Sequence, residues 1–233
     1  MKMASYKLIF PNRILALALL SFVISSQVVA REYDPDNGEE INEVCAGCHG
    51  EFGQGGGDGE YPRLAGMPAA FIARQLHLFR DRKRPNMAMI EYIDERQMPD
   101  SDIQDIAVFL ARITLKTKLP PANENDPGFN AYARLLASKQ VMQIPRAEGD
   151  QENGRKIYRK ECASCHGKLG EGDQEKAVPM LTGQYIDYLW RQVEKYRENI
   201  RIHDPEAPED QLLVEFSDTE LQDIFAYLSI LDD

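Results

Sequence analysis

The residues best suited to chemistry are the chain's four cysteines, which fall in two identical settings. Each pair has the spacing C-x-x-C-H, as CAGCH at 45–49 and CASCH at 162–166. Two thiols at this spacing can add across the vinyl groups of one porphyrin edge, and the histidine that follows then lies beneath the iron. The sequence therefore predicts two covalent haem c groups, with His49 and His166 as proximal iron ligands. The thioether bonds are assigned to Cys45, Cys48, Cys162 and Cys165.

Three other interpretations of the cysteine pairs fit less well. A thioredoxin-like pair needs a strand–helix–strand context, and the sequence has no such alternation. A zinc site built from two C-x-x-C pairs has about 15–20 residues between them, whereas these pairs are 117 residues apart. Disulfides would suit an oxidising compartment but leave the histidine after each pair unexplained.

The N-terminus has the three-part pattern of a secretory signal. Its positive region, Lys2, Lys7 and Arg13, precedes an apolar stretch at 14–25 and small residues at 28–30. We therefore expect residues 1–30 to be a signal peptide and the mature chain to be periplasmic. The alternative is an uncleaved anchor, although the apolar stretch is short for a membrane span. Membrane association would then come only from that anchor or from partners.

Charge narrows the range of partners. The chain has 27 lysines and arginines against 38 aspartates and glutamates, a formal net charge of −11. Nucleic acid is an unfavourable partner for such a chain, because affinity for phosphates comes mainly from basic side chains. We expect redox partner proteins that dock through basic patches.

The two halves of the chain are copies of one another. At an offset of 117 residues the halves align without a gap for about forty residues, and later the offset becomes 118. The matched pairs include Cys45/Cys162, His49/His166, Pro62/Pro179, Arg74/Arg191, Gln75/Gln192, Arg84/Arg201 and Asp105/Asp223. We predict domains at 31–119 and 145–233, joined by a linker at 120–144 that contains a short helix packed between them.

Each domain is predicted to be mainly α-helical. Apolar residues recur at helical spacing, and Ser217 with Glu220 forms a capping box. The expected helices are 39–45, 68–82, 100–113, 130–142, 152–162, 184–198 and 218–231. The methionine-bearing segment before 100–113 is expected to be a loop.

The C-x-x-C-H motif, a Pro-x-Leu-x-Gly segment, a loop carrying methionine and an aromatic-bearing last helix follow one another in the chain, and this order is repeated. With this pattern, the chain resembles the cytochrome c4-type dihaem cytochromes c. The segment YPRLAG at 61–66 carries the resemblance most clearly, and PMLTGQ at 179–184 is a looser copy. The resemblance covers nearly all of 38–233 apart from the linker. It implies a tandem duplication of two helical cytochrome c domains, each around a covalent haem, with the haem edges facing one another. It also implies periplasmic electron transfer from a quinol-oxidising complex or dehydrogenase towards a terminal oxidase or reductase.

The sixth iron ligand of the first haem is sought among the methionines before the last helix of that domain. Met98 lies immediately before this helix, where it is expected to pack as a hydrophobic staple. In the family the ligand lies some residues earlier, in a loop. We therefore expect Met89 to be the ligand, with Met87 as the alternative.

The second half departs from this pattern, because no methionine follows Met180. His203 aligns with the residue before the methionine cluster and is the candidate sixth ligand, since imidazole is a common axial ligand. His77 is expected to be a surface residue, and Lys195 is a more remote candidate. The alternative is an exposed His203 and a second haem that is five-coordinate or holds water. Four further side chains could pair with haem propionates: Tyr61, Arg63, Arg74 and Arg191.

These features favour a dihaem electron carrier that is not an enzyme. One alternative is a haem enzyme or sensor whose second haem has an open distal side. Another is the cytochrome subunit of a larger oxidoreductase complex, which would share the carrier's chemistry and differ in its affinity for partners.

Overall fold

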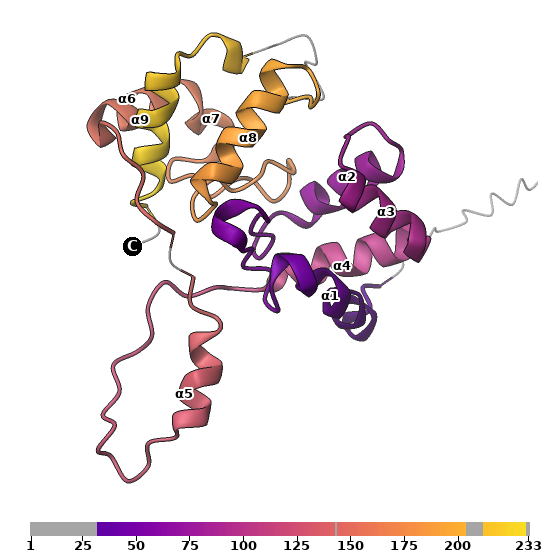
Figure 1. Ribbon diagram of the computed structural model, residues 1–233, viewed down its shortest axis with the longest axis vertical. Coiled ribbons are helices and arrows are strands. Elements are labelled where there is room, and N and C mark those ends of the chain that lie inside the picture. The colour runs from indigo at the N-terminus through magenta and orange to yellow at the C-terminus, as the bar shows by residue number, and fades with distance from the viewer. Residues whose placement is uncertain (1–31, 143, 204–211, 232–233) are drawn as a thin grey trace, which may run out of the picture. The chain divides into compact units, whose positions relative to one another are not determined.

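The computed structural model describes residues 32–142, 144–203 and 212–231 (Figure 1). Residues 32–233 form one unit, and the predicted signal peptide at 1–30 lies outside the described residues. The described part of the chain is mainly helical, with isolated β-bridges and no strand, which confirms the predicted fold class. None of its helices is long and apolar enough to cross a membrane.

The first module comprises α1 to α4, with a short 3-10 turn, η1 (Gly57–Gly59), in between. The α-helices are α1 (Pro35–His49), α2 (Ala69–Arg80), α3 (Met87–Arg96) and α4 (Asp100–Arg112). Helix α1 begins where the Asp34 carboxylate accepts hydrogen bonds from the backbone N–H groups of Asp36 and Asn37. Such a cap satisfies N–H groups that the first helical turn leaves free.

The second module comprises α6 to α9, with a 3-10 turn, η2 (Leu212–Val214), before the last helix. Its α-helices are α6 (Gln151–Glu161), α7 (Ala163–His166), α8 (Ile186–Arg197) and α9 (Asp218–Leu228). Helix α9 begins at the predicted capping box, in which Ser217 and Glu220 exchange side-chain to backbone hydrogen bonds.

In each module the first helix crosses the last, α1 on α4 and α6 on α9. A glycine lies at each crossing. A Cβ atom on Gly154 would lie 1.8 Å from the carbonyl oxygen of Asp223, and one on Gly38 would lie 2.9 Å from that of Asp105. These glycines therefore allow the two helix backbones to approach closely.

A buried carboxylate holds each crossing in place. Asp105 accepts hydrogen bonds from the Asp34 backbone N–H at 3.0 Å and from Asn37 Nδ2 at 2.7 Å. The second module repeats this arrangement, because Asp223 accepts from the Asp150 backbone N–H at 2.7 Å and from Asn153 Nδ2 at 2.8 Å. The carboxylate of the last helix thus fixes the start of the first.

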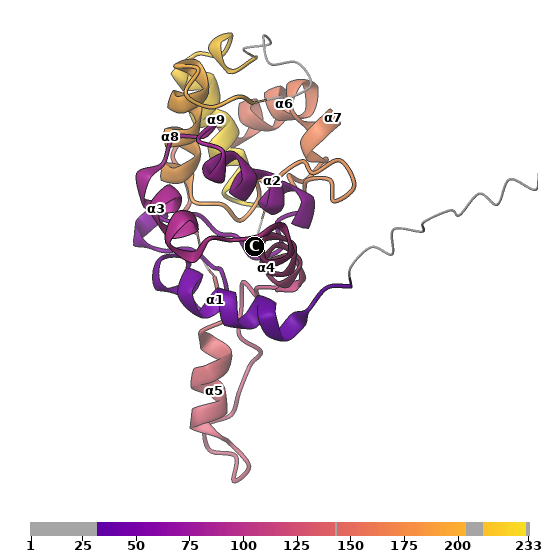
Figure 2. The same ribbon diagram turned by 90° about the vertical axis from the view of Figure 1, so that its right-hand side faces the viewer.

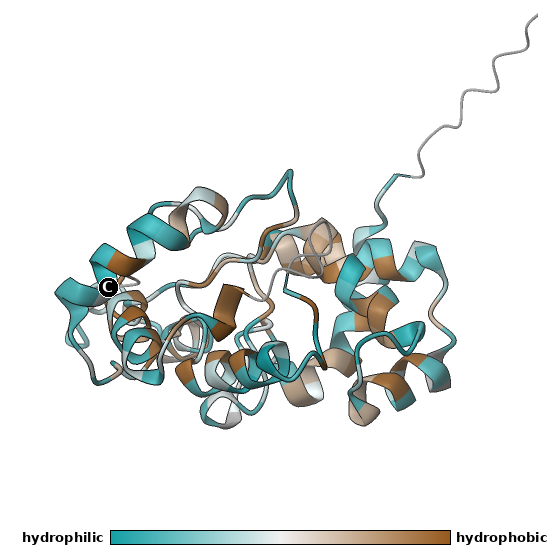
Figure 3. Ribbon diagram, turned by 90° about the horizontal axis from the view of Figure 1, so that it is seen from above, coloured by the Kyte–Doolittle hydropathy of each residue, from teal (hydrophilic) through white to brown (hydrophobic). Residues whose placement is uncertain are grey.

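Each module has its own apolar core, formed by the inward faces of its helices. Figure 3 shows apolar positions interspersed with polar ones along the helices, as amphipathic helices require. Buried core residues of the first module include Ile41, Ile72, Phe79, Ile93, Ile103 and Leu110. Those of the second include Tyr158, Leu189, Val193, Leu221, Ile224 and Leu228.

Two sequence expectations about elements were wrong. The methionine-bearing segment is not a loop, because helix α3 starts there with Asn86 as its cap. The linker does contain a helix, α5 (Ala131–Ser138), but none of its residues is buried. Figures 1 and 2 show α5 apart from the helices of both modules instead of packed between them. Its apolar residues Tyr132, Leu135 and Leu136 are exposed.

Candidate haem sites

The first attachment motif lies in the last turns of α1. Cys45 and Cys48 are three residues apart, which places them on one face of the helix, and neither forms a disulfide. His49 ends the helix and is buried, with only 9% of its surface exposed. Its Nδ1 lies 3.0 Å from the carbonyl oxygen of Pro62, which belongs to the YPRLAG segment.

The second motif repeats these contacts. Cys162 lies between α6 and α7, Cys165 follows in α7, and neither forms a disulfide. His166 is 9% exposed, and its Nδ1 lies 3.0 Å from the carbonyl oxygen of Pro179. The proline pair Pro62/Pro179, which the repeat singled out, therefore supplies the same contact in both modules.

These histidines have the protonation state and orientation that iron ligation needs. A ring N–H that donates to a backbone carbonyl fixes the tautomer and leaves the other ring nitrogen free to bind a metal. Burial lowers the pKa of His49 and, as the main cause, lowers the pKa of His166 to about 4. Both rings are therefore neutral at neutral pH. With two thiols beside each histidine, the donor set fits haem c.

The two methionine candidates differ in their surroundings. Met89 is half-buried and packs against the first core, as does Cys45. Met87, the first residue of α3, is 66% exposed. The Asn86 cap accepts a hydrogen bond from the Met89 backbone N–H at 3.4 Å, which ties the start of α3 to this residue. Met98 is a buried core residue, 5% exposed, in keeping with its expected packing role.

His203 lies beside the second attachment motif. Its ring centroid is 6.0 Å from that of His166, with 41° between the ring planes. The Tyr196 ring also lies near the His203 ring, with the centroids 5.2 Å apart and the planes nearly perpendicular. His77, by contrast, contacts Arg80 at 2.9 Å and lies near Asp100. Lys195 has its pKa lowered by burial and by the charge of Arg84.

The residues proposed to pair with propionates mostly make protein contacts. Arg74 donates to the carbonyl oxygen of Ala177 at 3.0 Å, and Arg191 donates to that of Glu60 at 3.2 Å. Because each arginine reaches a loop of the other module, the two contacts are related by the repeat. Arg63 donates to the carbonyl oxygens of Ala65 at 3.0 Å and Gly183 at 3.4 Å. The Tyr61 ring meets the His49 ring edge-on at 6.2 Å.

One cluster at the boundary between the modules was not predicted from the sequence. Four matched residues of the repeat, Gln75, Arg84, Gln192 and Arg201, hydrogen-bond to one another across this boundary. The sequence alignment at an offset of 117 residues showed that these residues are equivalent in the two halves. The alignment does not show that equivalent residues lie in contact in the folded protein.

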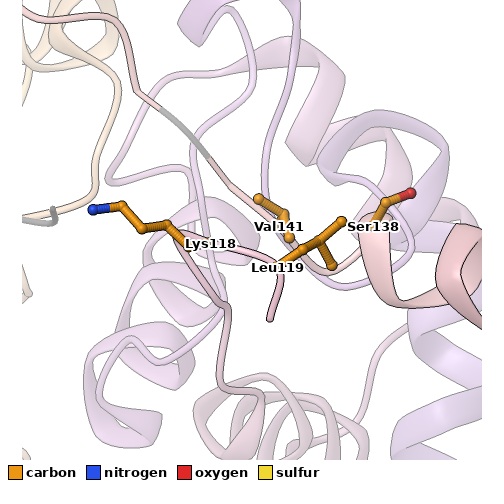
Figure 4. A pocket seen from close by; sticks show the side chains of 4 residues that line it. All are labelled: Lys118, Leu119, Ser138 and Val141. Carbon is orange, nitrogen blue, oxygen red and sulfur yellow. The ribbon is translucent and has the colours of Figure 1, made fainter. Parts of the chain in front are cut away.

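A hollow at the base of the linker carries no haem ligand. It is lined by Lys118, Leu119, Ser138 and Val141 (Figure 4). None of these residues belongs to an attachment motif, so the functional site is assigned to the motifs instead.

Two haem-attachment motifs, each with a buried histidine fixed by a carbonyl, define a dihaem c-type cytochrome. The sequence matches the Cytochrome c family over residues 35–114 and 151–232, and the chain belongs to that family. Each of the two matched regions contains one of the C-x-x-C-H motifs. The protein therefore carries two covalently attached haem c groups.

Relatives narrow the class further. The chain is 31% identical to "Cytochrome c4" of Thiocapsa roseopersicina over 199 residues, 84% of this chain and 91% of the relative. It is 29% identical to the "Thiosulfate dehydrogenase electron acceptor" of Stutzerimonas stutzeri (strain A1501) over 214 residues, 92% and 91% of the two chains. Reduced recombinant cytochrome c4 from Pseudomonas stutzeri shares the fold at TM-score 0.64 and 20% identity, covering 85% and 98%. The protein is a cytochrome c4-like electron-transfer protein.

Proposed function

We propose that this protein is a periplasmic electron carrier whose two haems have different axial ligands. The first would be held by His49 and Met89, and the second by His166 and His203. When bound, haem c supplies a one-electron ferric/ferrous couple. The observation that supports the proposal most is the 6.0 Å separation of the His166 and His203 rings. If both histidines bind the second iron, no position is left on that iron for a substrate, which favours electron transfer over catalysis.

The spacing of these two rings suits a shared metal ion. A metal–imidazole bond of about 2.0 Å on each side, added to the distance from nitrogen to ring centre, places the two centroids roughly 6 Å apart. The Tyr196 ring contacts the His203 ring edge-on, with the centroids 5.2 Å apart. These contacts support His203 as the proposed sixth ligand of the second haem. This arrangement favours a carrier over a haem enzyme or sensor with an open second iron.

Low-temperature EPR of the oxidised protein tests the ligand assignment. We expect two low-spin ferric signals and no substantial high-spin signal. His203→Ala should convert about half of the ferric haem to high spin, because one of two irons loses a strong ligand. His77→Ala is the matched control and should leave both signals unchanged. A high-spin signal in the wild-type protein would contradict the assignment and favour the enzyme or sensor.

The unequal ligands imply unequal potentials. Methionine opposite histidine raises the haem potential, so the first haem should be the more oxidising. An electron that enters at the second haem would then move to the first. We propose that donors deliver electrons to the second module and that acceptors take them from the first.

The donor is proposed to be a thiosulfate-oxidising dehydrogenase, with a quinol-oxidising complex as the alternative. A relative named as a thiosulfate dehydrogenase electron acceptor supports this, since the match spans 92% of the chain. The acidic composition favours basic docking patches on the partners. Stopped-flow reduction by a purified thiosulfate dehydrogenase with thiosulfate tests the proposal, and the rate should fall as salt rises. Reduction by a quinol-oxidising complex alone would identify the other donor.

A further inference from the structure

The segment that leads into each haem-attachment motif differs in charge between the two modules. Residues 35–51 of the first module align with residues 152–168 of the second at the offset of 117. The first segment has five acidic and no basic side chains, whereas the second has five basic and two acidic side chains. The formal charge is therefore −5 around the first motif and +3 around the second, although the chain as a whole carries −11.

The charge is reversed position by position. Three glutamates of the first segment align with lysines of the second, in the pairs Glu39/Lys156, Glu43/Lys160 and Glu51/Lys168. All six side chains are exposed. Arg155 and Arg159 add further positive charge where the first module has the neutral residues Gly38 and Asn42. The two copies therefore present opposite charges to solvent at equivalent places.

The positive side chains of α6, which leads into the second motif as α1 leads into the first (Figure 1), lie away from the core. The buried residues of this helix are Gly154 and Tyr158. Lysines at 156 and 160 are four residues apart, as are the arginines at 155 and 159. Like charges at this spacing destabilise a helix. The helix therefore gains nothing in stability from these repeated pairs.

Contacts within the protein neutralise only part of this positive charge. Glu152 pairs with Arg155 at 2.6 Å and with Lys156 at 3.9 Å, and Glu161 pairs with Lys160 at 2.5 Å. Two carboxylates thus serve three of the five cations in the segment. Basic residues also suit the last turn of a helix, because they face the negative end of its dipole. This does not account for Lys168, which lies beyond α7.

The reversed charges flank the residues that attach the haems. Lys160 comes two residues before Cys162, and Lys168 comes two residues after His166. Cys48 and Cys165 are exposed, one in each motif. A partner that docks over either motif therefore comes close to the edge at which that haem is attached. Complementary charge at such a place steers a partner and rejects one of like charge.

We propose that the two modules select redox partners of opposite charge. The basic face, formed by Lys156, Arg159, Lys160 and Lys168, docks a partner protein with an acidic surface. The acidic face, formed by Glu39, Glu43 and Glu51, docks a partner with a basic surface. The inference rests on the proposed function, in which electrons enter at the second module and leave from the first. The electron donor then has an acidic docking surface and the acceptor a basic one.

Small ionic oxidants test the basic face without a partner protein. The fully reduced protein gives one electron per haem to anionic hexacyanoferrate(III) or to cationic tris(phenanthroline)cobalt(III). In stopped-flow experiments at low salt, Lys156→Gln combined with Lys160→Gln should slow the anionic reaction about fivefold. The cationic reaction should stay as fast or become faster. Lys116→Gln combined with Lys118→Gln removes the same charge outside both faces, and it should leave the two rates within about twofold of wild type.

The acidic face should respond in the opposite sense. Glu39→Gln combined with Glu43→Gln should slow the cationic reaction about fivefold and spare the anionic one. A change in haem potential would instead move both reactions in the same direction, so opposite changes are specific to surface charge. Equal slowing by the lysine variant and its control, or an anionic reaction that the lysine variant leaves unchanged, would overturn the proposal.

Purified thiosulfate dehydrogenase with thiosulfate provides a protein donor for the same variants. The lysine variant should be reduced about fivefold more slowly than wild type at low salt, and the glutamate variant should not. The difference should vanish in about 1 M salt, where the Debye length is about 3 Å. Slower reduction of the glutamate variant alone would overturn the proposal. If this enzyme fails to reduce the wild-type protein, the proposed donor is wrong, and the ionic oxidants still decide whether the faces select by charge.

Discussion

At the scale of single residues, the two modules have the same proximal histidine contact but different candidate sixth ligands. His49 and His166 have the same carbonyl contact at the same distance of 3.0 Å. The candidate sixth ligands differ: Met89 is half-buried against the first core, and the His203 ring centroid lies 6.0 Å from that of His166. The repeat thus keeps the proximal histidine and its carbonyl contact, while the proposed sixth ligand differs between the modules.

The choice between Met89 and Met87 can be tested directly. Met89→Leu should abolish the near-infrared methionine-to-iron charge-transfer band of the first haem and lower its potential, because the thioether ligand is lost. Met87→Leu should leave the band in place, since Met87 is 66% exposed. The reverse result in absorption spectra of the oxidised variants would assign Met87 as the ligand.

At the scale of elements, the crossing of first and last helices depends on Asp105 and Asp223. Hydrogen bonds from Asn153 and from the Asp150 backbone lower the pKa of Asp223. A carboxylate with a lowered pKa contributes stability that is present above its unfolded pKa and is lost as the pH falls through its folded pKa. The α6–α9 crossing should therefore weaken in acid.

The Asp223→Asn variant tests this effect. Loss of charged hydrogen bonds should cost about 1.5–3 kcal/mol in the free energy of unfolding at pH 7. The difference from wild type should shrink below about pH 4, the ordinary pKa of an aspartate. Denaturant unfolding followed between pH 3 and pH 7 measures it, with the exposed Asp187→Asn as control. A difference independent of pH would contradict the argument.

Removal of the linker arm, residues 119–138, should have little effect on haem binding or on the stability of the protein. Its base is closed by backbone hydrogen bonds from Lys116 to Gln140 and from Met142 to Lys116. Since α5 buries no residue, replacing residues 119–138 with a short Gly/Ser turn should preserve both haem spectra. The free energy of unfolding should change by no more than about 0.5 kcal/mol, as for surface substitutions. A large loss of stability in calorimetry would show that the arm packs on a module.

At the scale of the whole described unit, the boundary between the modules contains both hydrogen bonds and apolar contacts. Gln184 accepts a hydrogen bond from the Arg63 backbone N–H and donates to the Arg63 carbonyl oxygen, both at 3.0 Å. Met180, the repeat partner of Arg63, instead packs against the core of the first module together with Met67. The boundary is thus held both by hydrogen bonds and by apolar burial.

Gln184→Ala should loosen this boundary. It leaves two buried backbone groups of Arg63 without that partner, which costs about 1–3 kcal/mol for each unsatisfied group. We expect calorimetry to show a broadened or divided thermal transition as the modules begin to unfold separately. Gln174→Ala, which removes one long contact of 3.4 Å to the Gly66 carbonyl, is the control. An unchanged single transition would mean that other contacts hold the modules together.

Comparison of the two halves at offsets of 117 and 118 residues identified the duplication. Local sequence was sufficient to identify the attachment motifs, the helical class and the α9 cap. These features depend on fixed spacing along one chain segment: C-x-x-C-H for thioether attachment, 3.6-residue periodicity for a helix face, and Ser217 to Glu220 for a cap. Helix α3 was missed because its cap, Asn86, precedes a methionine-rich stretch that the family resemblance marked as a loop.

Only the tertiary structure decided which distant residues meet. It placed His203 beside His166, gave both proximal histidines their carbonyl partners, and left α5 outside the modules. It also joined Arg84 and Arg201 through shared glutamines. Contacts between segments more than a hundred residues apart depend on how the modules pack, and no spacing along the chain encodes that packing.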